Sequence, residues 1–105
     1  MLLKTTTNRE WVNAGYEGAE RAVLRVTREG GRTSIVRLKK GARGPLHRHG
    51  AGEDALVLSG KVAIGGQTMS AGDYLYTEAG EEHDLVALED SVIYASTARP
   101  VTVLE

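Results

Sequence analysis

The chain has 105 residues and a formal net charge of -1, with 41% hydrophobic and 26% charged residues. This composition is typical of a soluble globular protein, and the length is enough for one compact domain but short for two. Because nucleic-acid affinity rests mainly on clustered Lys and Arg, the balanced charge argues against a nucleic-acid partner. The absence of cysteine excludes disulfides, thiolate metal sites and cysteine nucleophiles.

The N-terminal residues carry no recognisable targeting signal. Leu2 and Leu3 are followed by Lys4 and a polar stretch, whereas a secretory signal needs an apolar core of about 7–15 residues. No apolar run approaches the roughly 20 residues that cross a bilayer. We therefore expect a cytoplasmic protein that does not enter a membrane. Residues 7–14 are the one candidate for a short helix, with Asn8 as its N-cap.

From residue 21 onward the chain has the pattern of short strands separated by turns. Runs rich in β-branched residues are divided by pairs such as Gly30-Gly31 and Gly65-Gly66, which favour hairpins. No apolar residues recur with helical spacing over three turns, and both Pro45 and Pro100 fall between predicted strands. Such a set of strands in one domain predicts an all-β sandwich or barrel. The predicted strands cover residues 21–28, 32–39, 55–59, 61–64, 67–70, 74–77, 83–88, 91–97 and 101–104.

The three histidines and one glutamate have the spacing of a metal site. His47 and His49 are separated by one residue, so on an extended strand both imidazoles project from the same face. The glycines that follow can turn the chain and bring the carboxylate of Glu53 back towards them, and His83 opens a later strand. Three neutral imidazoles and a carboxylate suit a divalent ion such as Fe, Mn, Zn, Ni or Co, with positions left open for water or substrate. We therefore predict His47, His49, Glu53 and His83 as the metal ligands.

The same residues resemble the two sequence motifs of the cupin superfamily. Residues 41–60 look like the complete first motif, and residues 72–87 match the second motif in part. Glu78 and Ala87 depart from the second motif, where Pro and Asn are usual, but neither position supplies a metal ligand in the family. The resemblance implies one cupin domain over residues 1–105, an all-β double-stranded β-helix or jelly-roll barrel. The matching residues are Gly41, His47, His49, Glu53 and Gly60 in the first motif, and Gly72, Gly80 and His83 in the second.

A narrower resemblance is to the ChrR-type cupins. It rests on Trp11, on the string from Gly44 to His49, on Glu53-Asp54 and on the string from Val57 to Gly60. That group includes the sensing domains of anti-sigma factors and small stand-alone proteins, some of them related to dioxygenases. Anti-sigma members also carry a zinc-binding helical domain that uses His and Cys. Because this short sequence has no Cys, direct anti-sigma activity is disfavoured.

Several residues near the predicted site have a second, purely structural interpretation. Glu53 is a candidate base as well as a ligand. Tyr76 is a candidate proton donor or partner of a ligand, although tyrosines also serve as packing residues in a chain without Phe. Arg37 and Lys39 either line a pocket mouth or lie on an outer face, and Trp11 fits a plug or a dimer contact better than a substrate platform. The motif glycines suit backbone positions with positive φ.

Two classes of function follow from these residues. The first is an Fe- or Mn-dependent, dioxygenase-like enzyme that acts on a small organic substrate. The second is a non-catalytic sensor or binding module, in which metal and ligand occupancy alters a partner surface. A metal-free sugar epimerase is disfavoured by the complete ligand set, and a transcription regulator by the lack of a helix-turn-helix pattern. We also expect a homodimer, because the open strand edges of so small a sandwich favour association.

Overall fold

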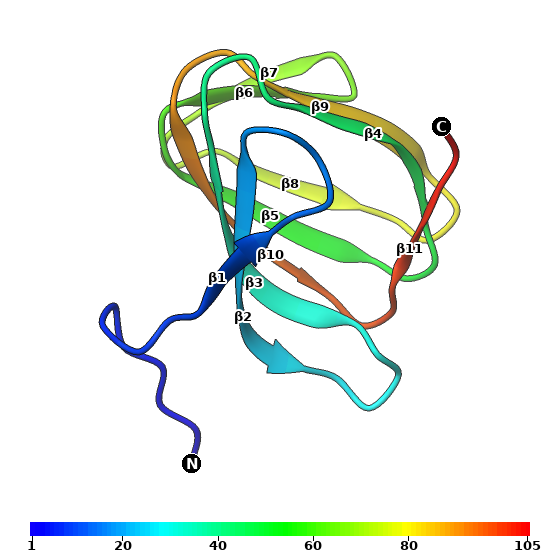
Figure 1. The fold of residues 1–105 in the computed structure, drawn as a ribbon. Helices are drawn as coiled ribbons and strands as arrows, with labels where there is room; N and C mark the ends of the chain where they lie inside the picture. The colour runs from blue at the N-terminus through cyan, green and yellow to red at the C-terminus, as the bar shows by residue number, and fades with distance from the viewer.

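Eleven strands and no helix make up the structure, a computed structural model that describes residues 1–105 (Figure 1). All pairings between the strands are antiparallel. No helix has the length and hydropathy needed to cross a membrane. The all-β prediction is therefore confirmed. The strands are β1 (Trp11–Asn13), β2 (Ala19–Val26), β3 (Arg32–Leu38), β4 (Arg43–His49), β5 (Glu53–Ser59), β6 (Lys61–Ile64), β7 (Gln67–Ser70), β8 (Tyr74–Thr77), β9 (Glu82–Ala87), β10 (Ser91–Thr97) and β11 (Val101–Val103).

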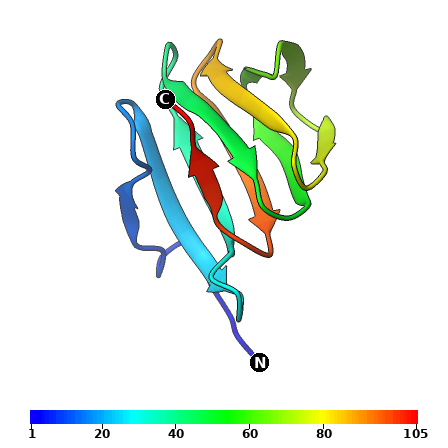
Figure 2. The ribbon, with the colours of Figure 1, turned by 90° about the vertical axis from the view of Figure 1, so that its right-hand side faces the viewer.

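The strands form two sheets that lie face to face (Figure 1). The six-stranded sheet has the order β1-β2-β3-β10-β5-β8, and the five-stranded sheet has the order β11-β4-β9-β6-β7. Strands that are distant in sequence therefore lie side by side, as C-terminal β11 does beside β4 (Figure 2). This crossing of successive strands between two sheets is the jelly-roll arrangement that the cupin resemblance implies.

The strand boundaries follow the sequence pattern closely. β6, β7, β8 and β10 span the residues predicted for them, and the ends of the other predicted strands differ by one or two residues. Three of these four strands, β6, β7 and β8, lie between Gly-containing turns, which restrict where pairing can begin.

The predicted short helix over residues 7–14 is wrong. Trp11–Asn13 instead form β1, which pairs with β2, and aromatic and β-branched side chains suit that pleated surface. The side chain of Asn8 does act as a local acceptor, but it accepts the backbone N–H of Thr5 at 2.8 Å within a turn. It therefore closes the turn and does not cap a helix.

Pro45 is also placed differently, because it lies inside β4 and not between strands. The register between β4 and β9 shifts between Gly44 and His47, so the proline occupies the irregular part of the ladder. Proline has no N–H to donate and is tolerated at such a bulge. The irregularity has a consequence for the site, since it sets the position of the Pro45 carbonyl beside His47.

The apolar core lies between the two sheets and forms the floor of a cavity. It comprises Ala19, Val36, Leu38, Ala42, Ala55, Val57, Val62, Ile64, Met69, Ala87 and Ile93. Val36, Ala55, Ile64 and Ile93 belong to this core and also line the cavity. These four apolar side chains therefore belong to the water-free core and also support the polar side chains of the cavity wall.

Gly60 occupies a position that only glycine fits. Its φ is 84°, a left-handed conformation that a side chain disfavours. A Cβ atom there would lie 2.3 Å from both the Asp90 carbonyl oxygen and the Ser91 Oγ. The other motif glycines, Gly41, Gly72 and Gly80, also have positive φ, as expected from the sequence.

We predict that Gly60→Ala destabilises the protein much more than Gly66→Ala. Gly66 also has a positive φ, but nothing lies within 4 Å of its added Cβ, so the control bears only the backbone strain of about 1–2 kcal/mol. Gly60→Ala adds a steric clash with backbone and should cost about 3 kcal/mol or more. Urea unfolding of the two variants measures the difference, and equal losses of unfolding free energy would contradict the close packing at Gly60.

Candidate metal centre

Three histidines project from β4 and β9 towards one another, and two of them, His47 and His83, line the cavity. His47 and His83 are register partners across the antiparallel pair, so their side chains lie on the same face of the sheet. His49 follows His47 by two residues and returns to that face. Two neighbouring strands therefore bring together residues that are more than thirty positions apart in the sequence.

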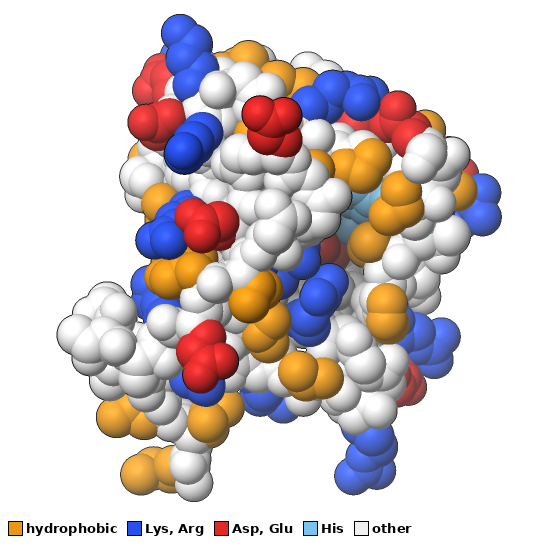
Figure 3. All heavy atoms as spheres, viewed as in Figure 1, with side chains coloured by type: hydrophobic (Ala, Val, Ile, Leu, Met, Phe, Trp, Pro, Cys, Tyr) orange, Lys and Arg blue, Asp and Glu red, His pale blue; other side chains and the backbone are white.

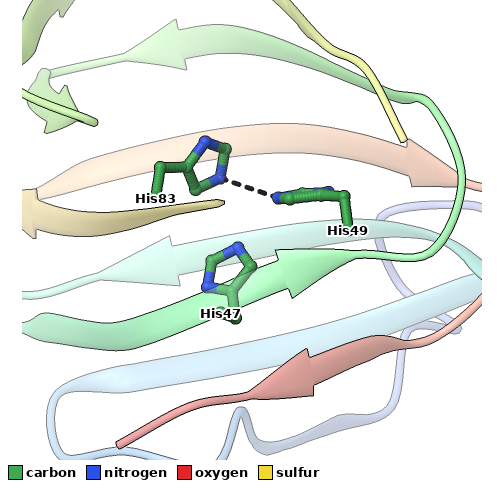
Figure 4. Close-up of side chains that lie close together, drawn as sticks. All are labelled: His47, His49 and His83. Atoms are coloured by element: carbon green, nitrogen blue, oxygen red, sulfur yellow. Dashed lines mark hydrogen bonds between the residues drawn. The ribbon is translucent and has the colours of Figure 1, made fainter. Parts of the chain in front are cut away.

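The three rings are close enough to hold a single ion. Their centroids lie 4.8, 4.7 and 4.5 Å apart, and one nitrogen from each ring lies within 4.8 Å of the other two. The Nε2 atoms of His49 and His83 are separated by 3.0 Å (Figure 4). Without an ion, one of these two nitrogens carries a hydrogen and donates it to the lone pair of the other.

Backbone contacts hold two of the rings in position. The Nδ1 atom of His47 lies 2.9 Å from the Pro45 carbonyl oxygen. A carbonyl only accepts, so Nδ1 carries the hydrogen and the lone pair of neutral His47 is left on Nε2. The backbone of His49 donates to the Glu81 carbonyl at 3.0 Å and accepts from the Gly80 N–H at 2.8 Å. The turn before β9 therefore fixes His49 as well as His83.

The environment keeps His49 and His83 neutral, which is the form that binds metal. His49 is only 1% exposed, and burial lowers its pKa to about 4, with the neighbouring His83 and His47 acting in the same direction. Burial also lowers the pKa of His83, again reinforced by His47. A buried imidazolium next to two other imidazoles is unfavourable. A metal ion therefore meets little competition from protons at these two sites near neutral pH.

The spacing and chemistry of the donors fit a divalent ion. Two nitrogens bound at right angles, each roughly 2.1 Å from an ion, would lie about 3.0 Å apart, and the His49 and His83 Nε2 atoms are separated by 3.0 Å. The Nδ1 atom of His49 is buried without a hydrogen-bond partner, so the only hydrogen bond of that ring is the one to His83, which a bound ion would replace. Imidazole donors suit Fe, Co, Ni, Cu and Zn, and a mixed nitrogen and oxygen set also suits Mn.

Glu53, the fourth predicted ligand, lines the same cavity as His47 and His83. Its carboxylate is not part of the group of donors that lie within 4.8 Å of one another, so its role as a ligand stays a prediction. Burial raises the pKa of Glu53 to about 7; Asp54 acts in the same direction and Arg21 opposes them. The carboxyl group is therefore poised to exchange a proton near neutral pH.

Tyr76, the candidate proton donor, is not among the residues that line the cavity. It pairs with Asp54 across β5 and β8, one residue out of phase with the inward-facing Glu53, and 52% of its surface is exposed. Its hydroxyl lies against Gly52, where an added Cβ would be 1.9 Å away. The structure therefore places Tyr76 on the outer face, away from the histidines.

Three large polar side chains that no sequence motif marks also line the cavity. It has a volume of about 320 Å³, and Tyr16, Arg21 and Arg32 are among the residues that line it. A larger hollow of about 550 Å³ lies on the outer face beside Arg37 and Lys39 and contains no histidine. In Figure 3 the histidine atoms are visible inside an opening in the surface, with basic and acidic side chains close by.

A model of the ChrR cupin-like domain matches residues 1–102 of the chain. The chain belongs to the ChrR cupin-like family. The resemblance that the two motifs and the flanking residues carry is thereby confirmed for nearly the whole sequence.

One curated relative of this ChrR cupin-like chain is a much longer protein. The DNA damage-repair/toleration protein DRT102 of Arabidopsis thaliana is 32% identical over 77 residues, an alignment that covers 68% of this chain and 25% of that protein. The chain thus spans about a quarter of the length of this curated relative.

Solved structures share the fold over most or all of the chain. A candidate acetylacetone dioxygenase from Methylibium petroleiphilum PM1 superposes with a TM-score of 0.90 at 22% identity, covering 100% of this chain and 81% of that one. The Rhodobacter sphaeroides SigE complex with the anti-sigma ChrR matches with a TM-score of 0.76 at 26% identity, covering 89% of this chain and 50% of that one. The first likeness shows the fold alone.

We predict that the affinity of this ChrR cupin-like chain for a divalent ion falls with acid. The three imidazoles must be neutral to bind. Below the pKa of a ligand, the affinity therefore drops by roughly tenfold per pH unit for each proton that the ion displaces. For His49 this loss begins only as the pH falls towards its pKa of about 4. Calorimetric titration with Ni²⁺ between about pH 7.5 and pH 4 measures the effect.

The matched variant is His49→Ala, which removes the most buried ligand. It should weaken Ni²⁺ binding by more than the roughly 100-fold that loss of an indirect partner costs. Undiminished affinity at pH 4, or in this variant, would contradict a three-histidine site.

Proposed function

We propose that the chain is a metal-dependent, dioxygenase-like enzyme that acts on a small organic substrate with two carbonyl groups separated by one carbon. The observation that carries the proposal is the convergence of His47, His49 and His83, of which His47 and His83 line a cavity of about 320 Å³. Three ligands on one side of an ion leave its other side free for substrate. The fold shared with a candidate acetylacetone dioxygenase is consistent with a β-dicarbonyl substrate.

The protein's own residues divide the work at such a centre. An Fe or Mn ion bound here would supply Lewis acidity and electron transfer to O₂. The neutral histidines hold that ion without cancelling its charge, which favours the enolate form of a β-dicarbonyl compound. The floor of Val36, Ala55, Ile64 and Ile93 excludes water from the substrate carbon chain.

Glu53 is the candidate proton acceptor in this reaction. Its raised pKa of about 7 and its place in the cavity wall suit the removal of a proton from the carbon between the two carbonyls. Cleavage of a carbon–carbon bond by O₂ places both oxygen atoms in the two products, so no outside reductant is required. The proton taken by Glu53 returns to one of those products, which restores the carboxylate.

We expect the iron-loaded protein to consume O₂ in the presence of 2,4-pentanedione, and Glu53→Gln to lower the rate by about 10²–10⁴-fold. The control is Glu89→Gln, because Glu89 is exposed and its side chain makes no hydrogen bond or ion pair. Oxygen-electrode rates and iron content are measured together, so that loss of a base is separated from loss of a ligand. Absence of O₂ uptake with β-diketones, phenolic ketones and flavonols would overturn the proposal.

A sensor function is the second candidate, and the similarity to the anti-sigma ChrR in its SigE complex favours it. In that case metal or ligand occupancy changes a surface that a protein partner recognises. Affinity capture with metal-loaded and metal-free protein distinguishes the two functions. A partner captured only in one of the two states, together with no O₂ uptake, would favour the sensor.

A further inference from the structure

Two arginines face the cavity that contains the histidines. Arg21 lies on β2 opposite Val36 of β3, and both residues line the cavity. Arg32 begins β3 two residues before Ser34, on the same face of the strand, and it also lines the cavity while remaining exposed to solvent. One cation therefore lies in the cavity wall and a second lies at its rim. Basic side chains are visible beside the opening in Figure 3.

Arg21 makes no ion pair or hydrogen bond within the protein, although it shares the cavity with Glu53. No carboxylate lies within 4.0 Å of its guanidinium and its side chain makes no hydrogen bond, whereas Arg37 pairs with Glu20 at 2.9 Å. Burial lowers the pKa of Arg21 and the charge of Arg32 adds to this effect, while Tyr16 and Glu53 oppose it without reversing it. A half-buried guanidinium with five unused donors is costly unless an anion approaches it.

The charges around the cavity favour an anionic guest. Glu53 is the one acidic residue that lines it, against the two arginines. A divalent ion on the histidines would add further positive charge, which neutral imidazoles do not offset. Tyr16 also lines the cavity, and its hydroxyl makes no hydrogen bond in the protein. It can therefore donate to an oxygen atom held by Arg21.

We propose that the natural ligand carries a carboxylate group, bound by Arg21 with Tyr16 beside it and Arg32 at the rim, while its other end faces the histidines. Arginine binds a planar carboxylate through two parallel N–H groups, which fixes orientation as well as charge. The identity of the reacting end rests on the proposed function. With that function, the ligand is a small dicarbonyl acid. The cavity volume of about 320 Å³ is at the lower end of the roughly 300–1,000 Å³ typical of ligand sites.

The test compares 4,6-dioxoheptanoate with its methyl ester, which differ in the negative charge of the carboxylate and in one methyl group. Binding is measured by calorimetry to metal-free protein and to Ni²⁺-loaded protein, where O₂ chemistry does not interfere. We expect the acid to bind at least about tenfold more tightly than the ester in both forms, as one charge-assisted pair predicts. Equal affinity for the two compounds, or no binding of either, would overturn the proposal.

Variants at two arginines show whether Arg21 is the cause. Arg21→Gln should abolish the preference for the acid, and Arg21→Lys should retain part of it because the charge remains. Arg37→Gln is the matched control, since Arg37 lies on the outer face over the Trp11 ring and should leave the preference unchanged. A folded Arg21→Gln protein that still prefers the acid tenfold would overturn the proposal. If Arg21→Gln fails to fold, the metal-free wild-type comparison and Arg21→Lys still decide.

O₂ uptake by the iron-loaded protein separates this inference from the proposed function. A preference for the acid that depends on Arg21, with no O₂ uptake on either compound, would support the carboxylate site and overturn the dioxygenase. Equal binding and equal O₂ uptake on acid and ester would overturn the carboxylate site and support the dioxygenase.

Discussion

The register between β4 and β9 is the constraint on which the site depends. It places His47 directly opposite His83, and a slip of one residue would turn one of these rings to the opposite face of the sheet. Arg48 and Glu82, the adjacent register pair, form an ion pair at 3.0 Å on the outward face. Such an exposed pair adds little stability, but a slip of one residue would turn one of these two charges into the cavity without its partner. The outward charges therefore oppose the wrong alignment while the inward rings define the right one.

The turn that follows β8 completes this arrangement. Gly80 has a φ of 90°, and the turn around it exchanges two backbone hydrogen bonds with His49. The third ring is thereby fixed to the segment that leads into His83, so the second motif positions a residue of the first. This explains why the departures at Glu78 and Ala87 from the usual second motif leave the histidine cluster intact. Neither residue supplies a ring or either of those two hydrogen bonds.

Local spacing made much of this site predictable from the sequence. The alternation of His47 and His49, the Gly-bounded turns and the two motifs depend on contacts close in sequence or on a well-known pattern. Arg21 could not be placed in the same way, because β2 does not alternate cleanly. Ala22 and its register partner Ile35 are buried although they face away from the cavity, on the same face as Trp11, the register partner of Ala22 in β1. With both faces of β2 buried, hydropathy does not reveal which face holds the charge.

The cavity also links function to stability through its ionisable groups. In the metal-free protein His49 has its pKa lowered from 6.5 to about 4, so its contribution to stability is lost as the pH falls through that range. Glu53 has its pKa raised from 4.5 to about 7, so its contribution is lost as the pH rises through that range. The two effects oppose each other between about pH 4.5 and 6.5, which flattens the pH dependence of folding. Arg21 adds an unpaired charge that an ordinary core would exclude. The cavity thus combines neutral imidazoles, a partly protonated carboxyl and an unpaired guanidinium. Its folded state is stabilised most when a cation and an anion bind there together.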